Sequence, residues 1–300
     1  MKDEKCLVTV VITTCKRSPE IVRRAVQSVI NQTYSEWELI LIDDSPNDYE
    51  YRHEVKGTIT CLKVNNNIRY VANEKNSGAC FSRNIGLEMA NGEFIAYLDD
   101  DDEWLPEKLQ KQVYALKNTS SNVALVYNPF YRIQEGNDKL ELIQRPLRSG
   151  NLYDVLMNDG NIFGGMSMPL MRTECVRKSG GFDIMMQSAQ DLDLWLRIAQ
   201  NYEVISFDDP LVIYHVHEGE QITSNPEKKI AGLERLYEKN KQYLDEHREI
   251  KWKRNLRLIG FYLAAEKRKE AFAIWRRTVP LCPMNILVNV KFLKQILMTR

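Results

Sequence analysis

The sequence predicts an α/β protein with a mostly parallel central sheet flanked by helices and with a helical C-terminal appendage. Short β-branched runs alternate with segments of helical periodicity through residue 127, which is typical of strand–helix–strand units. Acidic residues directly follow two of these runs, at the place where such sheets bind ligands. The final segment, 251–300, combines helical spacing with many basic residues.

The first strand–helix–strand unit lies at the start of the chain. The β-branched run 7–13 is typical of a fully buried strand. Ser18 and Pro19 indicate a helix start, with the serine as cap and the proline at the first helical position. A second strand, 38–43, ends at Asp43, which we interpret as a turn residue at the strand end.

The same alternation continues along the chain. Further strands are expected at 61–64, 69–72, 93–98 and 123–127, and helices at 79–89 and from Pro106 onward. The second half predicts a hairpin of 132–133 with 140–143, and helices over about 189–200 and 226–247. Segment 251–300 predicts two or three basic amphipathic helices, broken at Pro280 and Pro283.

The composition is that of an ordinary globular protein, with 44% hydrophobic and 27% charged residues, which excludes disordered and collagen-like classes. The 41 basic and 41 acidic residues give zero net charge, so the chain is not expected to bind nucleic acid. The charge is unevenly distributed, because residues 251–300 hold 12 basic and 2 acidic residues, a net charge of +10. The remaining residues therefore carry a net charge of −10.

A cytoplasmic location is expected. The charged N-terminus lacks the apolar stretch of a signal peptide, and no apolar run approaches the roughly 18–20 residues of a membrane span. The 6 cysteines are scattered and lack the spacing of a zinc site, which is typical of a protein with reduced thiols.

Four consecutive aspartates, Asp99 to Asp102, follow a predicted buried strand. Adjacent carboxylates repel one another, and a divalent cation such as Mg²⁺ or Mn²⁺ would relieve this repulsion. On an extended segment Asp99 and Asp101 lie on the same side and could flank one cation. The alternative is a solvated acidic turn that caps the helix at Pro106.

The sequence lacks the motifs of several other classes of metal- or nucleotide-binding protein. The acidic run has neither the glycine nor the glutamate of a calcium-binding EF-hand loop. The chain contains no P-loop, and no Gly-x-Gly-x-x-Gly follows the first strand, which argues against nucleotide triphosphatases and dinucleotide-binding enzymes. An aspartyl-nucleophile phosphatase would need Thr or Val where Glu103 stands.

A series of ordered motifs resembles the inverting family-2 glycosyltransferases with the GT-A fold. The motifs occupy residues 8–17, 28–34, 41–45, 76–86, 97–106, 180–183 and 190–197. The resemblance implies a GT-A domain over 1–225, with a nucleotide-binding part of about 1–106 and an acceptor-binding part of about 107–225. It leaves 226–300 as a helical, basic C-terminal extension.

The resemblance also implies which residues bind the donor, a nucleotide-sugar. Asp44 would accept the N3–H of a uracil or thymine base, which cytosine lacks. Arg83 would face the diphosphate, and Asp99 would approach the ribose or the donor sugar. The full set assigned to the donor is Thr13, Cys15, Arg17, Asp44, Asn76, Gly78, Arg83, Asp99 and Asp100.

By the same resemblance Asp101 and His217 would bind Mn²⁺ or Mg²⁺, and Asp191 would be the catalytic base. An inverting transfer needs one carboxylate that removes a proton from the acceptor hydroxyl. Gln190 stands where the family commonly has Glu, so a second carboxylate at that position is missing. The alternative for Asp191 is an acid in the first turn of a helix, and for His217 a structural histidine.

The basic segment 251–300 also holds aromatic and leucine residues, a combination that suits an anionic membrane surface. The functional interpretation is a peripheral anchor on the inner face of the cell membrane. The alternative is a solvated helical appendage.

The sequence thus predicts a metal-dependent inverting glycosyltransferase that uses a nucleoside-diphosphate sugar, with UDP favoured. The resemblance suggests a glycan or lipid-linked glycan acceptor in surface-polysaccharide synthesis, for example of a capsule or O-antigen. Two alternatives are a catalytically inactive sugar-nucleotide-binding protein and a nucleotidyltransferase. The latter would usually carry a glycine-rich loop with a lysine near the first strand, which residues 16–18 do not supply.

Overall fold

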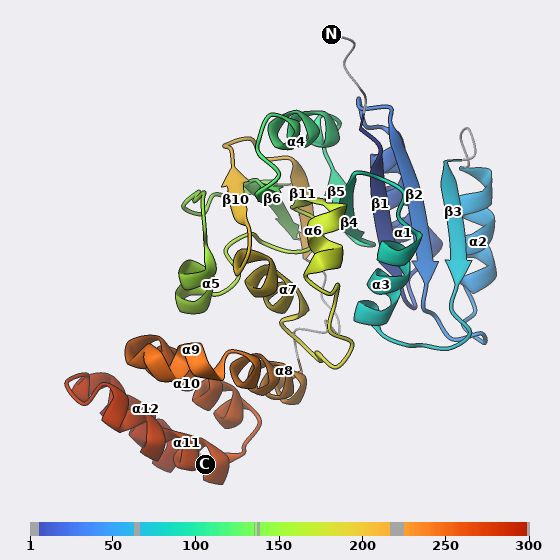
Figure 1. The fold of residues 1–300 in the computed structure, drawn as a ribbon. Helices are drawn as coiled ribbons and strands as arrows, with labels where there is room; N and C mark the ends of the chain where they lie inside the picture. The colour runs from blue at the N-terminus through green and yellow to red at the C-terminus, as the bar shows by residue number, and fades with distance from the viewer. Residues whose placement is uncertain (1–5, 63–66, 135, 137–138, 217–224, 299–300) are drawn as a thin grey trace. The chain divides into compact units, whose positions relative to one another are not determined.

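The computed structural model describes residues 6–62, 67–134, 136, 139–216 and 225–298 (Figure 1). The strands are β1 (Val8–Thr14), β2 (Trp37–Asp43), β3 (Ile68–Ala72), β4 (Phe94–Asp99), β5 (Glu103–Trp104), β6 (Val123–Tyr127), β7 (Phe130–Gln134), β8 (Glu141–Ile143), β9 (Leu170–Arg172), β10 (Glu203–Ser206) and β11 (Val212–Val216). The helices that precede β10 are α1 (Pro19–Ile30), α2 (Arg52–Cys61), α3 (Ala79–Met89), α4 (Lys108–Lys117), α5 (Tyr153–Asp159), α6 (Thr173–Lys178) and α7 (Gln190–Ala199). The C-terminal helices are α8 (Pro226–Lys239), α9 (Lys241–Glu246), α10 (Arg248–Ala264), α11 (Arg268–Thr278), the short 3₁₀ helix η1 (Val279–Leu281) and α12 (Ile286–Met298).

Within the described residues, a seven-stranded sheet has the order β10-β6-β9-β4-β1-β2-β3. Strand β1 pairs in parallel with both β2 and β4, whereas β9 runs antiparallel to β4 and β6. The chain proceeds from β1 to β2 and β3 on one side and then returns to place β4 on the other side of β1. The carboxyl ends of β1, β2 and β4 therefore meet at one sheet edge, where sheets of this type bind ligands.

A second, four-stranded sheet has the order β5-β11-β7-β8. Strand β11 pairs in parallel with β7 and antiparallel with β5. Strand β5 begins directly after the acidic run 99–102, which we call the acidic loop from here on. This small sheet therefore fixes the end of the acidic loop that leads into β5. Its hairpin of β7 and β8 confirms the hairpin predicted from the sequence.

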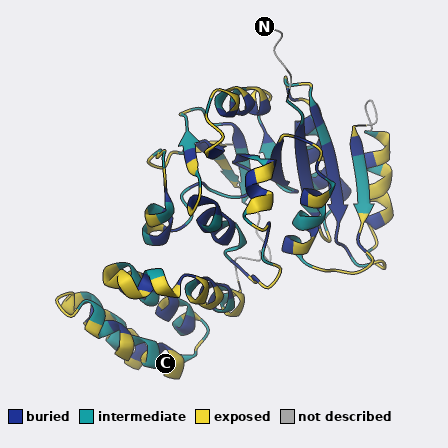
Figure 2. Cartoon of the chain, viewed as in Figure 1, coloured by how far each residue is buried: buried dark blue, intermediate teal, exposed yellow. Residues whose placement is uncertain are grey.

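Alternation along β1 determines which helices cover each face of the central sheet. Val8, Val10 and Ile12 are buried in one core with apolar residues of α1 and α2. Val11 points to the opposite face, where its side chain leaves no room for a Cβ on Gly86 of α3. Figure 1 shows α3 in front of β1 and β2, with α1 behind them, and the strands β1, β2 and β4 are almost entirely buried (Figure 2).

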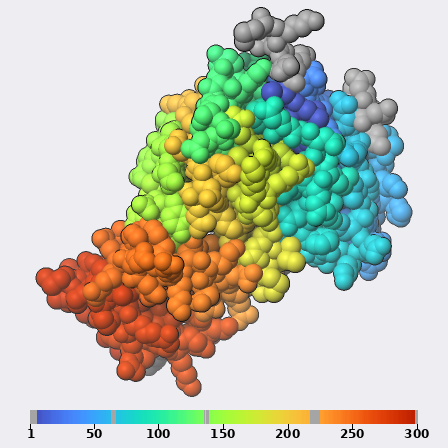
Figure 3. Space-filling model, viewed as in Figure 1, coloured from blue at the N-terminus to red at the C-terminus, as the bar shows by residue number. Residues whose placement is uncertain are grey.

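The chain divides into two compact units. The first contains both sheets, and the second contains the helices from α8 onward together with Met157–Gly160 and Met185–Asp193. In the second unit α10 packs against α8 and α11, and the Arg254 guanidinium donates to the Met157 carbonyl at 2.6 Å. The helices of this unit, orange to red in Figure 3, form a continuous body. The domain boundary at residue 225 stays a prediction.

Most expected elements are confirmed, and the differences have physical causes. The prediction of a strand at 61–64 is wrong for its described residues, because Cys61 is the last residue of α2. Val55 and Ile59 lie one helical turn apart and bury in the core, which extends the helix to this point. The helix expected at 226–247 is interrupted at Asn240. The two or three helices expected over 251–300 are confirmed as α10, α11 and α12, with a break before Arg268 that the sequence did not predict.

Among the described residues, no helix has both the length and the apolar character that crossing a bilayer requires.

Candidate active site

The Asp44 carboxylate lies at the N-terminus of α3 and is only 3% exposed. Its Oδ1 accepts hydrogen bonds from the Asn73 side-chain amide at 2.7 Å and from the Ser77 N–H at 2.9 Å. Its Oδ2 accepts from the N–H of Gly78 at 2.8 Å, and Gly78 has a φ of +90°, which favours glycine. Asp44 therefore joins the end of β2 to the loop directly before α3.

Cys15 and Asn76 lie next to Asp44. The Asn76 side-chain nitrogen lies 3.0 Å from Cys15 Sγ and 3.2 Å from the carbonyl oxygen of Asp44. Burial raises the pKa of the Cys15 thiol, and the nearby Asp44 carboxylate raises it further. The structure thus brings together Cys15, Asp44, Asn76 and Gly78, four of the residues that the sequence assigned to the donor.

Exposure alternates along the acidic run. Asp99 and Asp101 have side chains that are 33% and 22% exposed, whereas Asp100 and Asp102 are buried. The run is not the extended segment that the sequence predicted, because the Asp102 N–H donates to the Asp99 carbonyl at 3.1 Å and closes a turn, but Asp99 and Asp101 are the two whose side chains reach solvent. Two of the four carboxylates reach solvent, and the other two are enclosed by the chain.

The buried carboxylates are satisfied by side chains from distant parts of the sequence. Asp100 accepts from Thr14 Oγ1 at 2.6 Å and from Arg17 Nε at 3.1 Å, while burial raises its pKa to about 6. Asp102 accepts from the Ser167 hydroxyl and, at 3.2 Å, from the N–H of His215. Burial raises the pKa of Asp102 well above its ordinary value. These two groups hold the acidic loop in place.

Arginines neutralise the partly exposed carboxylates. Arg17 Nη2 lies 2.7 Å from Asp101 Oδ2, and Arg83 Nη2 lies 3.0 Å from Asp99 Oδ1. Arg24 donates to the Asp101 carbonyl at 2.6 Å. These contacts give the acidic run positive charge from the chain itself, and the divalent cation stays a prediction.

Thr13 lies in β1 opposite Asp99 of β4, which places it at the same sheet edge. We call the residues gathered at this edge the sheet-edge cluster. Its members are Thr13, Cys15, Arg17, Asp44, Asn76, Gly78, Arg83, Asp99, Asp100, Asp101 and Asp102. The cluster contains every residue assigned to the donor, and also Asp101.

The carboxylates of Asp99 and Asp101 fit Mg²⁺ or Mn²⁺ as ligands, because both are partly exposed and offer oxygen atoms. Among the described residues, no three Asp, Glu, His or Cys side chains converge as metal ligands. Mg²⁺ is usually held by one or two carboxylates together with substrate phosphates, so two carboxylates suffice for such a site. His217, the other predicted ligand, lies outside the described residues.

The Gly-Gly-Phe-Asp motif packs onto α3 beside this cluster. The Asn84 side chain accepts from the Phe182 N–H and donates to the Phe182 carbonyl, both at 2.8 Å. The Arg83 guanidinium lies 5.5 Å from the centre of the Phe182 ring. Two motifs that are about 100 residues apart in the sequence therefore support one another, and Phe182 helps to orient the arginine that pairs with Asp99.

Asp191 belongs to the second unit, in the segment Met185–Asp193, which we call the Asp191 segment. It lies in the first turn of α7, and its Oδ1 accepts from the Leu192 N–H at 2.7 Å. Ala189, two residues earlier, has a φ of +54°, which is uncommon for a residue with a side chain. The contact with the first-turn amide agrees with the structural alternative, and the catalytic role of Asp191 stays a prediction.

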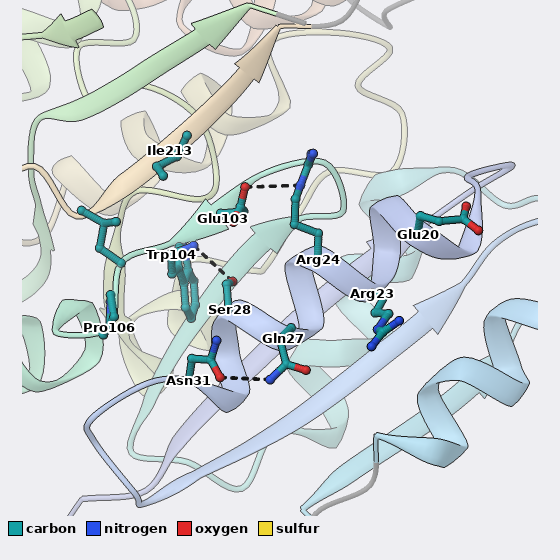
Figure 4. Close-up of a pocket in the computed structure, with 11 residues that line it drawn as sticks. Glu20, Arg23, Arg24, Gln27, Ser28, Asn31, Glu103, Trp104, Pro106 and Ile213 are labelled. Carbon is teal, nitrogen blue, oxygen red and sulfur yellow. Dashed lines mark hydrogen bonds and ion pairs between the residues drawn. The ribbon is translucent and has the colours of Figure 1, made fainter. Parts of the chain in front are cut away.

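A hollow of about 530 Å³ flanks the acidic loop (Figure 4). Arg24 points from α1 toward Glu103, and its Nε lies 3.4 Å from Glu103 Oε1. The Ser28 hydroxyl accepts from the Trp104 N–H at 3.1 Å and so joins α1 to β5. The lining includes no member of the sheet-edge cluster. The hollow is therefore separate from the cluster, and its lining residues Arg24 and Ser28 contact the chain next to the acidic loop.

Comparison with known proteins identifies the family. Residues 9–178 match the model of glycosyl transferase family 2. The chain belongs to this family. It is 32% identical over 244 residues to WcaA of Escherichia coli K12, which is named for colanic acid biosynthesis; the match covers 80% of this chain and 83% of WcaA.

This glycosyltransferase also resembles WfgD of Escherichia coli, named as a UDP-Glc:alpha-D-GlcNAc-diphosphoundecaprenol beta-1,3-glucosyltransferase. The two are 31% identical over 185 residues, which cover 60% of this chain and 65% of WfgD. Residues 1–349 of TarS from S. aureus, solved in complex with UDP-GlcNAc, share the fold with a TM-score of 0.63 and 16% identity. That match covers 96% of this chain and 81% of the TarS chain, and it confirms the GT-A fold.

Sequence reasoning missed several residues that shape the site of this glycosyltransferase. Thr14, Arg24 and Ser167 contact the acidic loop, and His215 contacts both Asp102 and Glu103. The only advance signals were that Thr14 directly follows the first predicted strand and that His215 lies two residues before the candidate ligand His217. Ser167 lies 65 residues from its partner in a segment without periodicity, so only folding reveals it.

Proposed function

We propose that this enzyme is a metal-dependent inverting glycosyltransferase that moves a sugar from a UDP-sugar to a glycan or lipid-linked glycan. The observation that carries the proposal is the sheet-edge cluster, where partly exposed Asp99 and Asp101 lie between Arg17 and Arg83. Carboxylates that can share a cation and arginines that can face phosphates are the groups a sugar diphosphate needs. The names of WfgD and of the TarS complex, which both contain a UDP-sugar, support this donor class.

The transfer assigns distinct roles to the residues of this chain. Asp191 would accept the proton of the acceptor hydroxyl as its oxygen forms a bond to the anomeric carbon. The bond between that carbon and the diphosphate oxygen breaks, and the diphosphate leaves with the bonding electrons. Arg83 and Arg17 would stabilise its negative charge by electrostatic contact. A divalent cation bound by Asp99 and Asp101 would supply further charge neutralisation.

The preference for uracil rests on Asp44. A carboxylate can accept the N3–H of uracil, whereas the unprotonated N3 of cytosine offers no hydrogen. Within the fold this carboxylate already accepts three hydrogen bonds from Asn73, Ser77 and Gly78. A base that contacts it would therefore meet a group held in one orientation, which favours discrimination between bases.

Surface-polysaccharide synthesis is the setting we propose, supported by the names of WcaA and WfgD. WfgD is named for an acceptor on diphosphoundecaprenol, a lipid carrier, so its acceptor resides at a membrane. An enzyme with such an acceptor gains from binding to the bilayer surface.

The exposed face of α12 suits an anionic membrane surface. Leu287 is 88% exposed and Ile286 is 63% exposed, and Leu297 is also exposed near the end of the helix. Lys291 and Lys294 lie exposed on the same helix. Apolar side chains that enter the interface and lysines that meet anionic headgroups are the two components of peripheral binding.

Calorimetry with UDP tests the donor and the metal together. We expect UDP to bind more tightly in Mn²⁺ than in EDTA, and more tightly than CDP. Asp101→Ala should abolish the effect of Mn²⁺, whereas Asp48→Ala, at an exposed carboxylate, should preserve it. Equal affinity for UDP and CDP would refute the uracil assignment. Mn²⁺-dependent UDP binding without any release of UDP from a panel of UDP-sugars would instead support the inactive binding protein.

Sedimentation with vesicles tests the membrane surface. The full chain should bind vesicles of phosphatidylcholine with phosphatidylglycerol and ignore pure phosphatidylcholine at low salt. Replacing Lys291 and Lys294 by Gln should weaken this binding about 30-fold, because each lysine contributes about 1 kcal/mol. The same replacement at exposed Lys56 and Lys117 of the first unit is the charge-matched control. Equal binding to both vesicle types would contradict the proposal.

A further inference from the structure

Two residues of α8 contact the Asp191 segment, one on each side of Asp191. Gly232 lies against Ser188, three residues before Asp191, and Lys239 pairs with Asp193, two residues after it. Both contacts lie within the second unit. No sequence motif draws attention to α8, whose composition is that of an ordinary polar helix.

The first contact depends on the absence of a side chain at Gly232. A Cβ at this position would lie 2.6 Å from the carbonyl oxygen and 2.8 Å from the backbone nitrogen of Ser188, and also against its hydroxyl. Backbone atoms cannot rotate away as a flexible side chain can. The helix therefore lies directly on the main chain of Ser188, and any larger residue must displace one of the two.

The second contact is an ion pair between a buried carboxylate and a lysine at the surface. The Asp193 side chain is 2% exposed, and its Oδ1 pairs with the Lys239 ammonium, which is 30% exposed. A buried carboxylate that loses its cationic partner is strongly destabilised, so this pair fixes where Asp193 can lie. The N–H of Asp193 in turn donates to the Ala189 carbonyl at 3.0 Å, which closes the turn that contains Asp191.

Between the two contacts lies the left-handed backbone of Ala189, with a φ of +54°. This conformation is strained for a residue with a Cβ, and it persists only where surrounding contacts enforce it. Gly232 holds the residue before Ala189, and Lys239 holds the residue whose N–H bonds to it. The helix thus enforces the conformation that sets the start of α7.

We propose that Gly232 and Lys239 are positioning residues for Asp191, so that α8 is part of the catalytic apparatus rather than an appendage. This inference rests on the proposed role of Asp191 as the base. A general base must lie within hydrogen-bond reach of the proton it removes, and a displacement of about 1 Å can reduce turnover about 100-fold. Holding the turn at both ends is what such accuracy requires.

Gly232→Ala tests the first contact, with Gly260→Ala as its matched control. Both replace a glycine inside a helix of the second unit by alanine, but a Cβ on Gly260 meets nothing within 4 Å. The readout is UDP release from the UDP-sugar that the wild-type chain hydrolyses fastest with Mn²⁺. We expect Gly232→Ala to lower kcat at least 10-fold with the affinity for UDP unchanged, and Gly260→Ala to stay within twofold of the wild type.

Lys239→Met tests the second contact, with Lys239→Arg as the conservative variant. Methionine keeps the length of the side chain but removes the charge, so kcat should fall at least 10-fold while the affinity for UDP is kept. Arginine can still pair with Asp193 and should restore most of the rate. Lys228→Met, at an exposed lysine on the same helix, is the control for lost charge.

Combination with Asp191→Asn separates this inference from the proposed function. If both residues act through Asp191, Gly232→Ala and Lys239→Met should add no further loss of kcat in the Asp191→Asn background. Wild-type kcat in folded Gly232→Ala, or full additivity in the double variants, would overturn the positioning role. An Asp191→Asn variant that keeps more than a tenth of the turnover would refute the base assignment itself.

Discussion

The sheet-edge cluster and the Asp191 segment are held in place by different means. In the cluster, charged groups contact one another and side chains from many elements, so Asp100 and Asp102 each have two partners from distant parts of the chain. The Asp191 segment is bounded by two contacts with α8, through Gly232 and Lys239. The difference teaches that the cluster is integral to the folded core, whereas the Asp191 segment depends on a helix that carries no family motif. Changes in the cluster should therefore reduce stability, and changes at Asp191 should reduce rate.

The largest expected effect is on the rate. Asp191→Asn keeps the size of the side chain but removes its ability to take a proton, so turnover should fall by about 10²–10⁴-fold. The affinity for UDP and the melting temperature should stay close to those of the wild type. Turnover and UDP affinity measured on one folded preparation check this expectation.

A structural role for Asp191 would give the opposite result, namely a lower melting temperature with nearly unchanged turnover per folded molecule. Asp193 and Asp183 would then be the next carboxylates to test as the base.

In the sheet-edge cluster, Asp44→Ala should reduce stability. The change leaves two backbone N–H groups, of Ser77 and Gly78, and the Asn73 amide without their acceptor. Unpaired buried donors predict a loss of about 2–4 kcal/mol in the free energy of unfolding, measured by urea denaturation. Asp48→Ala, four residues later on an exposed carboxylate, should change it by less than about 0.5 kcal/mol. A urea midpoint equal to that of the wild type for Asp44→Ala would show that water takes the place of the lost carboxylate.

The smallest expected effect is that of Ser167→Ala. It removes one of the two donors to the buried Asp102 carboxylate and should cost about 1–2 kcal/mol in urea denaturation. Because the other anchors of the acidic loop remain, UDP affinity in Mn²⁺ should change less than threefold. Ser121→Ala, at an exposed serine, is the control. A large loss of UDP affinity would contradict the view that the cluster is held redundantly.

Periodicity and motif order predicted much of the fold. The strand at 123–127 and the helix at 79–89 are confirmed to the residue, and Asp43 is confirmed as a turn residue because it accepts from the Ser45 N–H. Helix α2 shows the limit, because the sequence predicted a strand from Cys61, whereas Val55 and Ile59, one helical turn apart, pack into the core within a helix that ends at Cys61. Tertiary packing overrode local preference at that position.

The sequence by itself determined that acidic residues stand at the ends of buried parallel strands, because strand periodicity and chain connectivity are local properties. It also determined the family, through motifs whose spacing does not depend on packing. Only the tertiary structure decided that Arg17 and Arg83 neutralise Asp101 and Asp99, since these pairs join segments that are separate in the sequence and that the sheet brings together. It alone revealed Gly232 against Ser188, because a close approach between two backbones depends on how helices pack and leaves no periodic signal in the chain.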